Sequence, residues 1–207
     1  MSTSVADLKP KPKTATRRLP REQRREAILA GATRAFARAG FAATSMSDVA
    51  SASGITQLIV YRHFESKANL YRAVLEGVSS QLAEGFDGER GTAQDRGGLG
   101  LGLRSVLEAA RQDPEGFQLL WRHAAREPLF SCYASELRER AVATVELSLR
   151  KRFPSAPLPW AAHAVVGYLV ESVLVWLEFG DSARDDLFVN ATNEAMKAGV
   201  RAWSIQD

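Results

Sequence analysis

Residues 44–64 read TSMSDVASASGITQLIVYRHF, and this stretch decides how the rest of the chain is organised. Ser45 and Asp48 have the spacing of a capping box, which predicts that a helix begins there. Gly54 can adopt the positive φ that ends such a helix, and Thr56 is a candidate cap for a second helix. Two short helices around a glycine are the helix-turn-helix design, which places its second helix in the major groove of DNA.

The second helix, residues 57–64, is predicted to have an inward and an outward face. At about 100° per residue, Val60 and Phe64 share one face, while Leu58 and Arg62 point the opposite way. Glutamine can bond adenine and arginine can bond guanine, whereas leucine and isoleucine can only contact thymine methyl groups or sense groove shape. The alternative is that Leu58 and its neighbour lie in a core, but their direction opposes that of Val60. The residues that we expect to touch bases are Gln57, Leu58, Ile59 and Arg62.

This stretch and its flanks also resemble the TetR family of bacterial transcriptional regulators. The resemblance covers residues 22–75 and includes a threonine at the start, a glycine turn, a Tyr-x-His-Phe ending and a following Ser-Lys-x-x-Leu. The sequence departs from the family pattern at Leu58-Ile59, where relatives commonly carry Gly, Ala or Pro and then Thr. The residues that carry the resemblance are Thr44, Val49-Ala50, Gly54-Ile55-Thr56, Tyr61-Arg62-His63-Phe64 and Ser66-Lys67-Ala68-Asn69-Leu70.

The resemblance implies contacts with the DNA backbone in addition to those with bases. Tyr61, His63 and Lys67 match family positions near the backbone. Thr44 and Ser45 place hydroxyl and N–H groups at a helix N-terminus, which is a natural phosphate site. The full set expected to bind DNA is Thr44, Ser45, Ser47, Thr56, Gln57, Leu58, Ile59, Tyr61, Arg62, His63 and Lys67.

The distribution of charge supports a polyanionic partner. The net charge of the 207 residues is +3, but residues 1–72 carry 13 Lys or Arg against 5 Asp or Glu, and residues 73–207 carry 14 against 19. A basic N-terminal third, at +8, therefore precedes a mildly acidic remainder, at −5. Residues 1–20 are expected to form a disordered basic arm, which either contacts DNA or only raises solubility. Together with the helix-turn-helix, this asymmetry favours double-stranded DNA as the partner.

The composition limits the other possibilities. Hydrophobic residues make up 45% of the chain and charged residues 25%, as in ordinary globular proteins. The single cysteine, Cys132, excludes an internal disulfide framework and a multi-cysteine zinc site. No secretory signal is visible, so we expect a cytoplasmic protein. No catalytic motif, cofactor motif or metal-ligand spacing appears, so we expect no cofactor and rank an enzyme as a distant third possibility.

Helical periodicity predicts an all-α fold, with no sustained period-2 alternation. A first helix, residues 21–39, closed by Gly40, precedes the helix-turn-helix, and a fourth covers residues 66–82. Seven glycines between residues 85 and 102 predict a flexible connection. We expect a DNA-binding domain over residues 21–65 and a helical effector-binding and dimerisation domain over residues 66–207. The remaining helices are expected at residues 103–112, 114–125, 128–153, 159–179 and 183–203.

The most apolar segment, residues 160–179, is read as a soluble helix. His163, Glu171 and Glu178 interrupt it, which argues against a membrane span. Small residues on this helix and on the last one would let another backbone come close. In the resembled family the last two long helices form the dimer interface, so we expect a homodimer through residues 159–179 and 183–203.

The C-terminal domain is also expected to bind a small, largely apolar effector, as is usual in the resembled family. Aromatic side chains there could line a pocket, although aromatics at helical spacing are more often plain core. The expected function is that of a repressor that binds a near-palindromic operator as a dimer. The alternative is an architectural protein that binds DNA without a ligand. The candidate effector-binding residues are Phe117, Trp121, His123, Tyr133, Tyr168 and Trp176.

Overall fold

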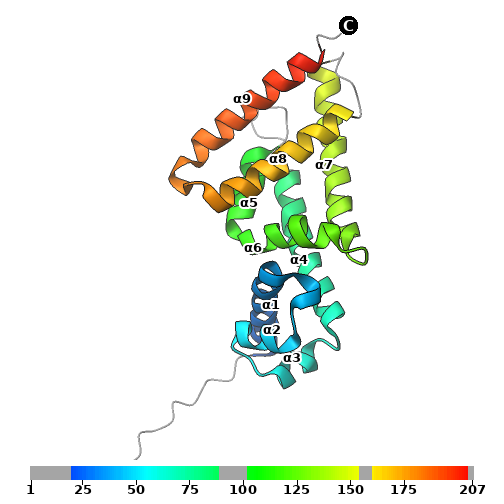
Figure 1. The fold of residues 1–207 in the computed structure, drawn as a ribbon, viewed down its shortest axis with the longest axis vertical. Coiled ribbons are helices and arrows are strands. Elements are labelled where there is room, and N and C mark those ends of the chain that lie inside the picture. The colour runs from blue at the N-terminus through cyan, green and yellow to red at the C-terminus, as the bar shows by residue number, and fades with distance from the viewer. Residues whose placement is uncertain (1–19, 89–101, 154–159, 205–207) are drawn as a thin grey trace, which may run out of the picture.

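The structure is a computed structural model that describes residues 20–88, 102–153 and 160–204. Within these ranges the chain forms helices and turns without a strand, and the predicted all-α class is confirmed. A small N-terminal domain lies at one end of an elongated molecule, a larger helical domain lies at the other, and α4 runs between them (Figure 1). The helices of the small domain and the connection are α1 Arg21–Ala43, α2 Met46–Ser53, α3 Gln57–His63 and α4 Lys67–Gly88.

The turns of the small domain form where the sequence predicts them. Gly40 has φ 75° and breaks α1, so the regular helix ends at the predicted place, and a short helical stretch then reaches Ala43. Ser45 and Asp48 make both bonds of the capping box at the start of α2. Gly54 has φ 66° and ends α2, and its N–H donates to carbonyls in the last turn of that helix. A left-handed residue at this position turns the chain directly into α3.

Helix α1 packs across α2 at very short distance. The two helices meet at Gly31, where an added Cβ would lie 2.6 Å from the Cβ of Ser53. Ile28 and Phe36 of α1 are fully buried, as are Val49 of α2 and Val60 of α3. The shared core therefore fixes the direction of α3 relative to α1.

An aromatic cluster joins the two domains. The ring of Tyr71 in α4 is fully buried, with its centroid 4.7 Å from that of Phe36, 5.0 Å from that of Phe41 and 4.7 Å from that of Phe130. Phe36 and Phe41 belong to α1, whereas Phe130 precedes α7 of the larger domain. Tyr71 therefore lies at the boundary between the two domains.

In the larger domain α8 packs against α5, α6, α7 and α9, and α9 lies along the edge of the domain while α8 crosses its middle (Figure 1). Two predicted helices differ from the observed ones. Residues 114–125 form α6 followed by a π-helical turn, Leu119–His123, and a 3-10 turn, Ala124–Arg126. Helix α7 begins at Ser131, because the chain turns at Pro128. The helices of this domain are α5 Leu103–Gln112, α6 Pro114–Gln118, α7 Ser131–Arg152, α8 Trp160–Phe179 and α9 Asp185–Ser204.

Three further predictions lie outside the described residues or differ from the structure. The basic arm lies outside them, except for Pro20. Helix α4 continues beyond the predicted end at residue 82 as far as Gly88, so the glycine-rich connection begins later than expected, and residues 89–101 lie outside the described part. A 3-10 turn, Ser182–Arg184, precedes α9, whose predicted start at residue 183 shifts to Asp185.

The close approach of α1 and α2 predicts that a larger residue at position 31 destabilises the fold. Gly31→Ala should lower the free energy of unfolding by about 1–3 kcal/mol, because the added methyl group would overlap Ser53. Gly77→Ala in α4 is the matched control: nothing lies within 4 Å of its added Cβ, so it should raise stability by about 0.5–1 kcal/mol. Urea denaturation measures both. Equal stability of the two variants would contradict the close packing.

Candidate nucleic-acid interface

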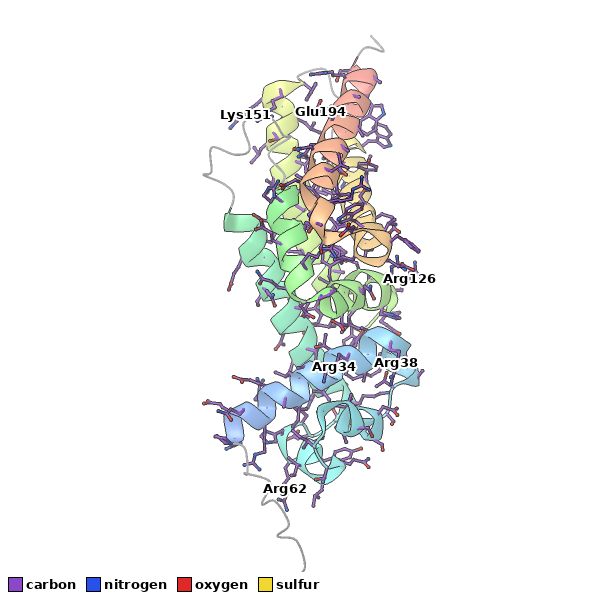
Figure 2. The ribbon with its side chains drawn as sticks, turned by 90° about the vertical axis from the view of Figure 1, so that its left-hand side faces the viewer. Arg34, Arg38, Arg62, Arg126, Lys151 and Glu194 are labelled. Carbon is purple, nitrogen blue, oxygen red and sulfur yellow. The ribbon has the colours of Figure 1, made fainter. Side chains whose placement is uncertain are left out.

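Helix α3 presents one half of its surface to solvent. Leu58 is 63% exposed and Tyr61 is 47% exposed, whereas Val60 is fully buried. Gln57 is also exposed, and Arg62 projects from the end of the molecule farthest from α9 (Figure 2). The predicted inward and outward faces are therefore confirmed, and Leu58 does not belong to a core. Ile59 is only half-buried.

The start of α2 is already occupied by a carboxylate. The Ser45 N–H and hydroxyl donate to Asp48 Oδ2 at 2.8 and 2.6 Å, and the Asp48 N–H donates to Ser45 Oγ at 3.1 Å. The Ser45 hydroxyl bond, followed by the bond from its N–H, lowers the pKa of Asp48, so its negative charge persists at neutral pH. That charge opposes a phosphate at this helix end. Ser47 is exposed there, beside the cap.

Thr44 lies inside the domain rather than on the expected phosphate-facing surface. Its side chain is buried, and its hydroxyl donates to the carbonyl of Gly40 at 2.7 Å and to that of Ala35 at 3.2 Å. It thus satisfies carbonyl groups at the broken end of α1. Thr56 precedes α3 as predicted, but its hydroxyl does not cap the helix and is exposed.

Lys67 is engaged within the domain. Its Nζ donates to the carbonyls of Phe41, Ala42 and Thr44 at 2.8, 3.3 and 2.9 Å. The same ammonium lies 4.5 Å from the centroid of the Phe41 ring. An ammonium has three N–H donors, so these bonds use all of them. The structure thus places Lys67 as a link between the start of α4 and the end of α1.

Arginines at the start of α1 act electrostatically on His63 near the end of α3, and Arg25 lies 5.5 Å from the ring centroid of Phe64. Burial lowers the pKa of His63, and the positive charges of Arg21, Arg24 and Arg25 lower it further. These arginines are not among the residues expected from the sequence to bind DNA. Their spacing of i, i+3 and i+4 was a usable signal, since it places them on one face of α1.

The candidates for effector binding contact different neighbours among the described residues. Phe117 and Trp121 are buried together, with ring centroids 6.3 Å apart. His123 lies at the domain junction, where its Nδ1 would be 3.2 Å from a Cβ added to Gly40. Tyr133 lines an open groove of about 240 Å³ between α4 and α7.

The last two candidates lie farther away, between α8 and α9. Tyr168 and Trp176 line a separate groove of about 340 Å³ with Phe188. The Trp176 ring stacks on Phe188 at 4.8 Å, and its Nε1–H donates to Asp185 at 2.6 Å. Within the described part of the chain, no three His, Cys, Asp or Glu side chains are grouped so that they could hold a metal ion.

The fold and this surface define the class: a helix-turn-helix protein with a second helical domain. Residues 28–74 match the family of bacterial regulatory proteins called the tetR family. The predicted resemblance to the TetR family of bacterial transcriptional regulators is therefore confirmed for the helix-turn-helix part of the chain.

Curated relatives share mainly the N-terminal part. The transcriptional activator FasR of Mycolicibacterium smegmatis is 31% identical over 107 residues, which are 51% of this chain and 49% of FasR. The transcriptional repressor Rv3405c of Mycobacterium tuberculosis is 42% identical over 74 residues, which are 35% of this chain and 39% of the repressor. The chain thus spans about half or less of the length of these relatives. These relatives are named as regulators of transcription.

Solved structures support the same fold over most of the chain. A TetR-like transcriptional regulator from Rhodococcus sp. RHA1 has a TM-score of 0.71 at 20% identity, covering 89% of this chain and 99% of that one. The fatty acid degradation regulator FadR from Bacillus halodurans has a TM-score of 0.63 at 14% identity, covering 86% and 96%. At these identities the likeness shows the fold alone.

The three bonds from Lys67 Nζ to backbone carbonyls predict that this side chain stabilises the fold. Lys67→Met should lower the free energy of unfolding by about 2–3 kcal/mol, because charge-assisted bonds are lost and partly buried carbonyls lose their donor. The matched control is Lys151→Met, on an exposed lysine in the last turn of α7, which should change stability by less than about 0.5 kcal/mol. Urea denaturation followed by circular dichroism measures both. A loss no larger than that of the control would contradict the assignment.

Proposed function

We propose that this protein regulates transcription by binding a near-palindromic operator as a homodimer, with α3 in the major groove. The observation that carries the proposal is the outward face of α3, which follows a glycine turn built with positive φ. Gln57 and Arg62 supply the donors and acceptors that can distinguish adenine and guanine, and Leu58 supplies an apolar contact for thymine. Ser47, Thr56 and Tyr61 are exposed around this face and are suited to phosphate contacts.

The homodimer proposal rests on the outer surface of α8 and α9. Helix α8 is long and apolar enough to cross a membrane, yet only 39% of its most apolar window is buried within the subunit. Apolar surface of this kind is commonly covered by a partner. A second copy packed through residues 159–179 and 183–203 would cover it. The large apolar side chains left exposed on these helices are Trp160, Tyr168, Val175, Phe179 and Leu187.

We further propose that a small, largely apolar effector binds within residues 103–179 and changes operator affinity through α4. Phe117 and Trp121 are the best candidates, because they pack together in the described core of this domain. The buried indole Nε1–H of Trp121 has no hydrogen-bond partner among the described residues, so a ligand with an acceptor atom would satisfy it. An effector acts only through its difference in affinity for the DNA-competent and incompetent states.

The direction of regulation proposed here is repression. The relatives include an activator and a repressor by name, so similarity alone favours neither. A dimer seated on an operator blocks access to that DNA without any further contact, which makes repression the simpler consequence. The second candidate is an architectural protein that binds DNA without an effector.

Selection of bound duplexes from a random pool tests the function directly. The regulator should enrich one motif with a dyad, whose half-sites are centred about 34–36 Å apart or a multiple of that distance. A metabolite extract added to the selection should reduce recovery of that motif. An architectural protein would instead enrich no motif and ignore the extract. Failure to retain any duplex would exclude both functions.

Substitutions on α3 should separate base reading from general affinity. Gln57→Ala and Arg62→Ala should each relax selectivity at one base pair by about 1–3 kcal/mol, because a bidentate contact is lost. Lys151→Ala, at the opposite end of the molecule (Figure 2), should leave selectivity unchanged. Titrations of the selected duplex and its single-base variants by fluorescence anisotropy measure the effect. Unchanged selectivity in both α3 variants would show that another element reads the bases.

Charges placed in the proposed dimer interface should separate the subunits. The double variant Phe179→Asp/Leu187→Asp replaces side chains that are 78% and 57% exposed in the subunit. Its expected state is a monomer at micromolar concentration, since two buried carboxylates per subunit are strongly unfavourable. Leu147→Asp on α7, which is also exposed but lies outside the interface, should remain a dimer. Light scattering makes the comparison, and a monomeric wild type would refute the proposal.

A further inference from the structure

The indole of Trp121 is buried in the larger domain, yet its N–H has no acceptor. Trp121 lies in the π-helical turn Leu119–His123 and is only 7% exposed. Its Nε1 atom is buried and has no hydrogen-bond partner among the described residues. This atom can only donate, and a buried tryptophan usually finds an acceptor for it. The unmet donor lowers the stability of the ligand-free fold, because the unfolded chain would give the same N–H to water.

A cation without a carboxylate lies over the same ring. The guanidinium carbon of Arg138, in α7, is 5.1 Å from the centroid of the Trp121 ring. Arg138 is half-buried, and it belongs to none of the ion pairs between described residues. The attraction between a guanidinium and an aromatic face is weaker than that between a guanidinium and a carboxylate. The side chain therefore keeps an unused capacity to bind an anion.

These two donors are suited to a single carboxylate group. Nε1 is an atom of the ring that the guanidinium covers, so the indole N–H and the guanidinium N–H groups are neighbours. A carboxylate has two oxygens and about four acceptor positions. One oxygen can accept from Trp121 Nε1 while the other pairs with the N–H groups of Arg138, a charge-assisted bond that neutral acceptors do not form.

The other neighbours of the indole are apolar. The ring centroid of Phe117 lies 6.3 Å from that of Trp121, with 60° between the two planes. Phe117, Leu119 and Leu120 are buried on the same stretch of chain. Apolar side chains around a few convergent polar groups are the usual composition of a small-molecule site, and π-helical turns occur frequently at functional sites. These surroundings suit a ligand with an apolar body and one anionic group.

We propose that Trp121 and Arg138 bind the carboxylate of a small apolar monocarboxylic acid, whose body packs against Phe117. This inference rests on the proposed effector function and names the chemical class of the effector. Arg138 selects for an anion, and Trp121 requires an acceptor atom. The turn that holds the acid also contacts the small domain, because Nδ1 of His123 would be 3.2 Å from a Cβ added to Gly40 of α1.

Calorimetric titration of the full-length chain compares acids with their neutral counterparts. The probes are the straight-chain acids from butanoate to dodecanoate and the aryl acids from benzoate to phenylbutyrate, each paired with its primary amide. The amide keeps the shape and an acceptor oxygen but has no charge. Wild type should bind at least one acid with a Kd below about 1 mM, and the amide of that acid about tenfold more weakly or worse.

Substitutions separate the two donors. Arg138→Gln should weaken binding of the acid about ten- to hundredfold and leave binding of the amide unchanged, which also shows that the site is still folded. Trp121→Phe keeps an aromatic ring but removes the N–H, so it should weaken both acid and amide about three- to tenfold. Arg126→Gln is the matched control: it removes an exposed arginine of the neighbouring 3-10 turn and should bind the acid as wild type does.

Each outcome decides for or against the carboxylate site. If the amides bind as tightly as the acids, or if Arg138→Gln keeps the wild-type affinity for the acid, the inference is wrong and the proposed effector function stands. If no acid binds, the inference is also wrong, and the effect of the metabolite extract on operator selection shows separately whether an effector function remains. Loss of acid binding in Arg138→Gln, with amide binding retained, supports the site.

Discussion

The ammonium group of Lys67 links the helix that runs through the molecule to the domain that presents α3. Lys67 is the first residue of α4, and its Nζ bonds three carbonyls around the broken end of α1. The helix breaks at Gly40, whose backbone is not helical. The break leaves carbonyl groups without a partner in the helix, and these need other donors. Thr44 satisfies the carbonyl of Gly40 from within, and Lys67 satisfies those that follow. A helix defect in α1 thus becomes the attachment point of α4.

One turn further along α4, the Tyr71 ring closes the junction between the domains. It packs between rings of α1 and the ring of Phe130, while its hydroxyl is buried without a partner among the described residues. Burying a hydroxyl without a hydrogen-bond partner lowers the stability of the fold by about 1–3 kcal/mol. The packing of the rings must stabilise the junction by more than this. Close-packed rings do not deform continuously.

The arginines of the small domain have different roles. Arg34 is turned back to the carbonyl of Ala52, where it satisfies the end of α2. Arg62 points outward from α3 (Figure 2). The positive charges of Arg21, Arg24 and Arg25 at the start of α1 lower the pKa of His63, after the larger effect of burial. The positive charge seen in the N-terminal third is thus divided between structural bonds and surface that is open to a polyanion.

The sequence by itself determined the local structure. A capping box and a left-handed glycine act within a few residues, so the turns at Ser45 and Gly54 formed where expected, and α5 has its predicted bounds, Leu103–Gln112. The outward direction of Leu58 followed from helical periodicity in the same way. Only the tertiary structure decided that Lys67 and Thr44 bond the end of α1, and that Arg25 of α1 lies against the ring of Phe64 at the end of α3. These contacts join residues far apart in the chain, and helix packing, which local periodicity does not encode, brings them together.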